Sequence, residues 1–296
     1  FGIDGTIIGS GNLTKTGVGP LQINAGASNF KGIWIINQGK VILNSTTALG
    51  QCGAVVDSST NLDVKVASST NSLVVKKYGF VTLNANLTVQ AAVFDEINIP
   101  AGTYTASNYP TFLGGTGTLT VAKSIAIANA PDAGSITVTS DAGDAYSWTD
   151  GTNSLASTST FTPTSTGAYL VKATSSAGCM VTSAPIYFQT IALQKGWNLI
   201  STNIHPSDSN IATLFKNIDV EEIKTMDAFW RKGQNSILNS LQKITSGNGY
   251  LVHMNIAASI AITGRVTPFS KVTPVTSNGW QLIGCPFQTA TQMAGV

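Results

Sequence analysis

Short apolar runs separated by Gly, Asn and Ser fill the N-terminal part of the chain, up to Val121. Each run is rich in Val, Ile and Leu, as in Ile33–Ile36, Val41–Leu43 and Leu62–Val66. The runs recur about every 8 to 14 residues, and helical periodicity is almost absent. Spacing of this kind is typical of a β-sandwich or of a coiled solenoid, and the periodicity alone leaves both open.

Glycine-rich passages favour the solenoid. They are Gly9–Gly26 (GSGNLTKTGVGPLQINAG), Gly39–Asn44, Pro100–Thr105 and Gly115–Val121. These passages resemble the passenger repeat of autotransporter-type secreted proteins. The resemblance implies a right-handed β-helix over residues 1–127, in which each rung stacks its inward Leu, Ile and Val on the next.

The pattern changes after Ala128–Gly134, where Pro and Gly interrupt the chain. Trp148 lies in a short strand-like run and is followed, about 20 residues later, by a Gly-x-Tyr-x-Val motif that contains Tyr169. Together with the Ala177–Cys179 turn, this spacing resembles an immunoglobulin-like β-sandwich over residues 128–190. The resemblance implies that Trp148 is the core Trp and Tyr169 the corner Tyr.

An internal repeat marks the C-terminal part. Gly196–Ile200 (GWNLI) recurs as Gly279–Ile283 (GWQLI), an offset of 279 − 196 = 83 residues. With Gly249–Met254, this arrangement resembles a GWNLIS-type module of bacterial surface and secreted proteins, mainly of the Bacteroidetes. The resemblance implies a small β-rich module over 191–278. Residues 279–296 are then the start of a second copy, truncated or completing a neighbouring fold.

Within this module we expect one short helix at Ile211–Ile218, with Ser209 or Asp208 as its N-cap. Strands are expected at Thr225–Trp230 and Gly249–Met254. The predicted fold class is therefore all-β: a right-handed β-helix, an Ig-like sandwich and a small β-rich module with one short helix.

Only 10% of the residues are charged, whereas ordinary soluble domains carry about 25%. The 16 basic and 14 acidic side chains are scattered singly, which argues against nucleic acid as a partner. No apolar window is long enough to span a membrane. Because the chain opens at Phe1 without a charged leader, we interpret it as a mature or excised piece of a longer polypeptide.

The cysteines Cys52, Cys179 and Cys285 are odd in number and far apart. This spacing predicts neither a disulfide framework nor a metal site. We expect each of them to be a small buried hydrophobe. A bridge between two would leave the third unpaired, and the sequence leaves the disulfide state open.

No residue is predicted to be catalytic. His205 is expected in a turn and His253 on a strand, and a GxSxG elbow is absent. A polysaccharide-cleaving solenoid would rely on Asp63, Lys65, Asp95 and Glu96. Because Asp95 and Glu96 are neighbours, we expect them on opposite faces of a strand, where they cannot act as a pair.

Metal and cofactor sites are not predicted either. The nearest candidate for Ca²⁺ is the group Asp141, Asp144 and Asp150, which lacks the spacing of a calcium loop. We interpret these residues as a solvated loop.

Aromatic residues supply the weak candidates for ligand binding. They are Trp34, expected to be half exposed, and an aromatic-basic patch of Phe229, Trp230 and Arg231. Trp197 and Trp280 occupy equivalent repeat positions, which indicates packing rather than binding.

These features predict a non-enzymatic structural or adhesive protein, a fragment of a large bacterial surface or secreted polypeptide. The family resemblance implies export across an outer membrane, by the Bacteroidetes type IX pathway. Expected partners are other surface proteins, host or extracellular glycans, or copies of the chain itself. The alternatives are a self-assembling fibre or sheath subunit, and a β-helix polysaccharide lyase, hydrolase or carbohydrate-binding protein.

Overall fold

The computed structural model describes residues 1–26, 29–128, 137–206, 208–266 and 281–285. Two compact units are distinguished by their internal contacts. The first comprises Phe1–Ile127, Thr139–Thr160 and Leu170–Ala184, and the second Ala128–Val138, Phe161–Tyr169 and Pro185–Val296. The domain boundaries expected from the sequence remain predictions.

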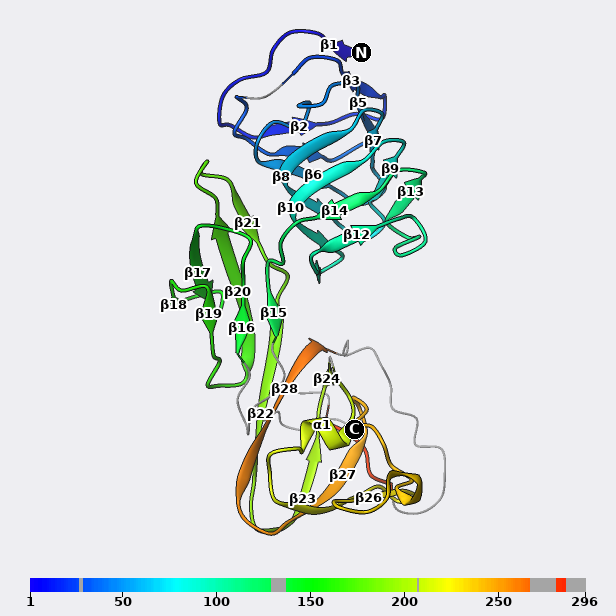
Figure 1. Ribbon diagram of the computed structural model, residues 1–296, viewed down its shortest axis with the longest axis vertical. Coiled ribbons are helices and arrows are strands. Elements are labelled where there is room, and N and C mark those ends of the chain that lie inside the picture. The colour runs from blue at the N-terminus through cyan, green and yellow to red at the C-terminus, as the bar shows by residue number, and fades with distance from the viewer. Residues whose placement is uncertain (27–28, 129–136, 207, 267–280, 286–296) are drawn as a thin grey trace, which may run out of the picture. The chain divides into compact units, whose positions relative to one another are not determined.

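A β-solenoid of about five turns forms the N-terminal part, as the apolar pattern predicts. One sheet contains β1 (Gly2–Ile3), β3 (Leu21–Ile23), β5 (Lys40–Leu43), β7 (Asn61–Val64), β9 (Phe80–Leu83) and β13 (Leu113–Gly115). The other contains β2 (Leu13–Lys15), β4 (Trp34–Ile36), β6 (Gly53–Val56), β8 (Ser68–Val75), β10 (Leu87–Phe94), β14 (Leu119–Val121) and β12 (Gly102–Tyr104). β11 (Ile97–Ile99) pairs with β10. Figure 1 shows the strands stacked turn upon turn.

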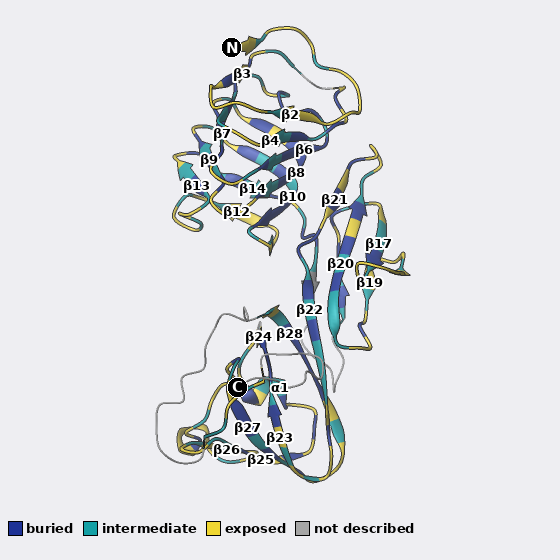
Figure 2. Ribbon diagram, turned by 180° about the vertical axis from the view of Figure 1, so that it is seen from behind, coloured by how far each residue is buried: buried dark blue, intermediate teal, exposed yellow. Residues whose placement is uncertain are grey.

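Aligned apolar side chains form the core of the solenoid. Strands of successive turns pair in parallel, so that equivalent residues lie directly above one another. One such column consists of Leu21, Val41, Leu62, Val81 and Leu113. Each of these side chains is buried, and Figure 2 shows buried residues along the strands of successive turns. Full burial of a Val or Leu side chain contributes about 1.5–3 kcal/mol.

Left-handed residues make the tight turns between the two sheets. Gly39 precedes β5 with φ +72°, and Ser59 and Tyr78 take positive φ values (59° and 64°) in the next two turns. Only the first of these positions is occupied by glycine, the residue that adopts such angles without strain.

Polar side chains connect the turns on the outer surface. Asn44 donates from Nδ2 to Asn24 Oδ1 over 2.8 Å, and Asn24 donates to Asp4 Oδ1 over 2.7 Å. Amides can donate and accept at once, so they pair from turn to turn without a net charge. The low proportion of charged residues is consistent with such a surface.

An antiparallel sheet completes the first unit. It consists of β17 (Ala145–Thr149), β18 (Ser154–Ala156), β21 (Met180–Thr182) and residues Leu170–Thr174 of β20 (Gly167–Thr174). Trp148 is fully buried, as expected, and its Nε1 donates to the Thr158 carbonyl over 2.9 Å. The short strands β15 (Ile127–Ala128), β16 (Val138–Thr139) and β19 (Thr160–Phe161) form a separate small sheet. An Ig-like sandwich is not confirmed.

The second unit is also rich in strands. Tyr169 lies in it, and its hydroxyl donates to the Ser165 carbonyl over 2.6 Å. One set of paired strands comprises Gly167–Tyr169 of β20, β22 (Ile186–Leu193), β28 (Ala258–Val266) and β24 (Ile204–Pro206). A further sheet has the order β23 (Gly196–Ser201), β27 (Gly249–Met254), β25 (Val220–Lys224) and β26 (Phe229–Arg231).

The expected helix is shorter than its pattern predicts. α1 covers Ile211–Leu214, and its N-cap is Asn210, whose side chain accepts from the Ala212 N–H over 2.9 Å. The predicted caps Ser209 and Asp208 are therefore wrong, because the N-cap Asn210 lies one residue after Ser209. A 3₁₀ turn, η1, covers Ser236–Leu238.

Two of the predicted local assignments in this unit are also corrected. The strand expected at Thr225–Trp230 is instead a turn followed by β26, since the Thr225 N–H is bonded to the Ala228 carbonyl. His205 lies in strand β24 rather than in a turn. The strand at Gly249–Met254 is confirmed as β27.

Among the described residues, no helix is long and apolar enough to cross a membrane. The second GWNLI-like segment lies largely outside the described residues. Of the part that is described, Ile283 forms a bridge to Asn248, and the Gly284 N–H bonds the Gly247 carbonyl over 2.9 Å.

Candidate functional site

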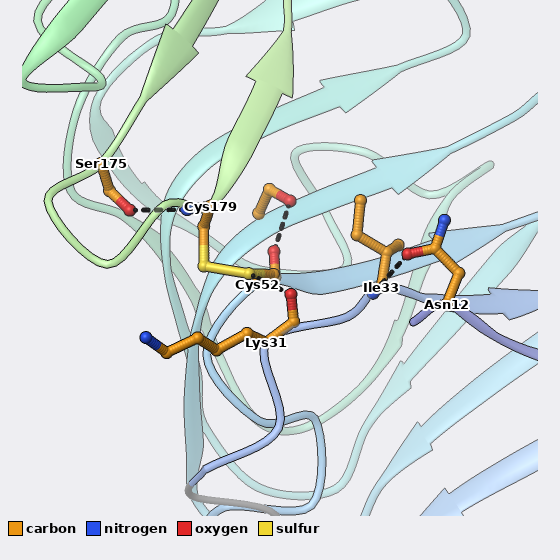
Figure 3. The surroundings of a disulfide bond; sticks show 7 residues. Asn12, Lys31, Ile33, Cys52, Ser175 and Cys179 are labelled. Carbon is orange, nitrogen blue, oxygen red and sulfur yellow. Dashed lines mark hydrogen bonds between the residues drawn. A yellow bond between two sulfur atoms is a disulfide. The ribbon is translucent and has the colours of Figure 1, made fainter. Parts of the chain in front are cut away.

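A disulfide joins Cys52 to Cys179, which are 127 residues apart in sequence. Figure 3 shows the bond between the start of β6 and the turn that joins β20 to β21. Both cysteines are buried, as expected, and they are joined to each other rather than free, a state that their spacing in the sequence left open. The physical reason is that sequence spacing says nothing of distance in the fold, where the two Cα atoms are 5.0 Å apart. Cys285 is exposed, not buried.

Two further links attach the β17–β21 sheet to the solenoid within the first unit. The Ala184 N–H donates to Asn98 Oδ1 over 2.7 Å. The Ser124 N–H donates to Asp141 Oδ1 over 2.7 Å. The disulfide therefore belongs to an attachment made at several points.

A groove that is lined mainly by residues with uncharged polar side chains lies next to the disulfide. Its volume is about 430 Å³, and it is lined by Thr47, Gly50, Gln51, Ser69, Thr70, Asn71, Thr88, Gln90, Ser175, Ala177 and Cys179. All of these residues belong to the first unit. Sequence reasoning missed the groove. The signal that could have indicated it is the uninterrupted polar run Ser68–Ser72, which lies beside the partly polar run Leu87–Ala91 of the next turn.

Asp63 on β7, one of the residues considered for a polysaccharide-cleaving solenoid, lies in a cluster of ion pairs. Asp63 has a side chain only 2% exposed, and its Oδ2 lies 2.6 Å from Lys40 Nζ and 3.4 Å from Lys65 Nζ. Asn84 donates to its Oδ1 over 2.8 Å. Burial acts to raise the pKa of Asp63, but the bonds from Lys40 and Asn84 and the two lysine charges lower it overall. The ion pairs and hydrogen bonds occupy both carboxylate oxygens.

Asp95 and Glu96 form the two-residue turn between β10 and β11, with φ values of 42° and 60°. The expectation that they lie on opposite faces of an extended strand is therefore wrong. Two consecutive left-handed residues are the geometry of a tight hairpin loop.

The aromatic-basic patch is divided between two faces of β26. Phe229 is 37% exposed, whereas Trp230 is 7% exposed and packs in the core of the second unit. Alternate residues of a strand point to opposite faces, which explains the division. Arg231 is exposed and its Nη2 lies 3.2 Å from Glu222 Oε1. Trp34 is 2% exposed, so the expectation of half exposure is wrong.

Trp197, whose repeat position indicates packing rather than binding, is 52% exposed. Its ring lies 4.8 Å from the ring of His253, and Lys224 Nζ lies 5.1 Å from the ring centre. His253 lies on β27, as expected, with Nδ1 2.8 Å from Glu221 Oε2. These neighbours cover part of the indole. Trp280 lies outside the described residues.

The three aspartates considered for Ca²⁺ bind backbone N–H groups. Asp144 Oδ2 accepts from the Ser176 N–H, and Asp150 accepts from the N–H groups of Asn153 and Thr152. Those bonds lower the pKa of Asp150 to about 2. In the part of the chain that the structure describes, no group of three or more His, Cys, Asp or Glu side chains could hold a metal ion.

No protein-family model, no curated protein and no solved structure matches this chain. Interpretation of the function therefore depends on the geometry described above.

Proposed function

We propose that the chain is a non-enzymatic extracellular protein with a structural or adhesive role. The observation that carries the proposal is the Cys52–Cys179 disulfide. Structural disulfides form and persist in oxidising compartments and are rare in the cytosol. A secreted or surface location follows from this argument.

A structural role is supported by the way the polar groups are used. Asp63 is enclosed by Lys40 and Asn84, and Asn44 and Asn24 bond one turn to the next. These groups connect turns of the solenoid. Stacked turns of this kind form an extended surface suited to adhesion.

The location is tested in the cells that produce the protein. Free thiols are blocked with N-ethylmaleimide, and the unreduced protein is digested and examined by mass spectrometry. We expect a Cys52–Cys179 linked peptide, and cleavage of the protein when intact cells are treated with protease. Alkylated Cys52 and Cys179 in a protein that resists protease until the cells are broken would contradict the proposal.

The non-enzymatic part has a separate test. The purified chain is incubated with pectin, alginate and glycosaminoglycans, and the release of shorter chains is measured. We expect none. Turnover that is lost in Asp95→Asn or Glu96→Gln would instead support the polysaccharide-cleaving alternative. Electron microscopy distinguishes the fibre alternative, since a filament subunit assembles as its concentration rises.

A further inference from the structure

The groove beside the disulfide has a neutral, hydrogen-bonding lining. The lining residues that the structure describes carry hydroxyl groups, side-chain amides or no polar side-chain group. Cys179, the member that could otherwise titrate, is bonded to Cys52. Because no lining side chain carries a charge, the groove offers an ionic ligand no compensation for its lost hydration.

Two adjacent turns of the solenoid supply equivalent groups to this lining. Ser69 on β8 pairs directly with Thr88 on β10. Asn71 and Gln90 follow on the same strands, between the paired residues Thr70–Val89 and Ser72–Ala91. Neighbouring strands are about 4.8 Å apart. The groove therefore presents a hydroxyl and an amide on each turn, repeated along the solenoid axis.

Two buried side-chain atoms of the lining lack hydrogen-bond partners among the described residues. Thr70 and Asn71 are 8% and 7% exposed. Thr70 Oγ1 and Asn71 Nδ2 have no partner within the described part of the chain. Buried polar groups in folded proteins are almost always paired. Asn71 shares one face of β8 with Ser69. A ligand hydroxyl in the groove would supply its missing partner after the amide rotates toward the groove.

The turn that borders the groove is held rigidly. The Gly178 N–H bonds the Ser175 carbonyl over 2.8 Å, and the Ser175 N–H bonds the Cys179 carbonyl over 2.9 Å. Ser175 Oγ accepts from the Cys179 N–H over 3.2 Å, and the disulfide fixes the turn to Cys52. A preformed wall reduces the entropy that a ligand must overcome on binding.

We propose that this groove binds a segment of an uncharged polysaccharide through its repeated hydroxyl and amide groups. Sugar rings offer repeated hydroxyls that both donate and accept, which matches Ser, Thr, Asn and Gln. A peptide that binds by adding a strand needs a free strand edge for backbone pairing. At Leu87–Val89, β10 has strand neighbours on both sides, β8 and β14, whereas β6 pairs with β8 only at Ser72–Val75. The inference rests on the proposed adhesive role and names the class of its ligand.

Isothermal titration of the whole chain tests the inference. The probes are cello-, xylo- and mannohexaose, with oligogalacturonate and a hyaluronan oligosaccharide as charged comparisons. We expect at least one neutral probe to bind and both charged probes to bind at least tenfold more weakly. Gln90→Ala should weaken binding of the neutral probe at least tenfold. Gln194→Ala, which removes an exposed glutamine in the second unit, should not change it.

A steric variant gives a second, independent readout. Ser69 is exposed at the groove, and Ser69→Trp should fill the space and abolish binding. Ser58→Trp, at an exposed turn that does not line the groove, is the matched control and should bind normally. Circular dichroism checks that each variant remains folded.

The inference is overturned if no neutral probe binds, if charged probes bind better, or if binding survives both Gln90→Ala and Ser69→Trp. Peptides selected from a library for binding to the chain would also overturn it, in favour of a peptide ligand, if Ser69→Trp abolished their binding. Failure of the proposed function is a different result. A disulfide-linked surface protein that binds no glycan rejects only the groove inference, whereas a glycan-binding protein found reduced inside cells rejects only the extracellular role.

Discussion

Lys40 Nζ lies 2.6 Å from Asp63 Oδ2, so that one turn of the solenoid neutralises a buried carboxylate carried by the next. Asn84, on the following turn, donates to the other oxygen of the same carboxylate. Three successive turns are thus joined through one side chain. A carboxylate that is buried is costly unless it is paired and hydrogen-bonded, which makes this cluster sensitive to the loss of any partner.

Lys40→Met should lower the free energy of unfolding by about 1–3 kcal/mol, because it removes a charged hydrogen bond from the buried Asp63 carboxylate. Lys76→Met is the matched control. Lys76 pairs with Asp57, whose side chain is 27% exposed, and exposed pairs contribute about 1 kcal/mol or less. Urea denaturation of both variants measures the difference. Equal losses would show that burial of Asp63 does not add to the strength of its ion pair.

The Asp63 cluster should also make stability depend on pH. Its pKa in the folded chain lies below the ordinary value of 3.8, so the unfolded chain binds this proton more readily. The stabilisation is therefore present above about pH 4 and is lost as the pH falls through the lower folded pKa. Denaturation of the wild type and of Asp63→Asn between pH 7 and pH 2 should show a stability difference that shrinks below pH 4. The pKa of Asp57 is also lowered. Because Asp57 is present in both proteins, its effect on stability cancels in the difference between them. A difference that stayed constant to pH 2 would contradict the assignment.

Removal of the disulfide should destabilise the first unit. Cys52→Ala with Cys179→Ala opens a cross-link between residues 127 positions apart, and such cross-links typically contribute about 2–4 kcal/mol. The thermal midpoint of the double variant should fall, and reducing agent should no longer affect it. Cys285→Ala changes an exposed cysteine outside this bond and should leave the midpoint unchanged. A double variant as stable as the wild type would mean that Asn98 and Asp141 suffice to hold the attached sheet.

The solenoid could be predicted from the sequence because its inward positions repeat at short intervals in the chain. Leu21, Val41 and Leu62 are spaced by one turn each, and the parallel ladder places them in one column. The turns were less evident. Gly39 carries the usual signal for a left-handed residue, but Ser59 and Tyr78 adopt the same region with no such signal.

The disulfide, the groove and the exposure of Trp197 could not be predicted, since each depends on contacts between distant segments. Cys52 and Cys179 meet only because the β20–β21 turn lies against the solenoid. Trp197 lies on a strand whose pattern does not reveal which face of the sheet is covered. Local periodicity identifies an apolar position but does not show whether a neighbouring element packs on it.

The close approach of two turns at Gly53 gives a final prediction. Gly53 has φ +116°, and a Cβ at this position would overlap the carbonyl of Ser72 on the next turn. Gly9 has nearly the same angle, φ +113°, with open space around its would-be Cβ. Alanine at either position incurs the strain of a left-handed residue, about 1–2 kcal/mol. Only Gly53→Ala adds an overlap, which should cost about 1–3 kcal/mol more. Chemical denaturation of the two variants measures this excess directly, and mass spectrometry of the unreduced proteins checks that the adjacent Cys52 remains bonded. Equal destabilisation would show that β6 and β8 can separate at this position without loss.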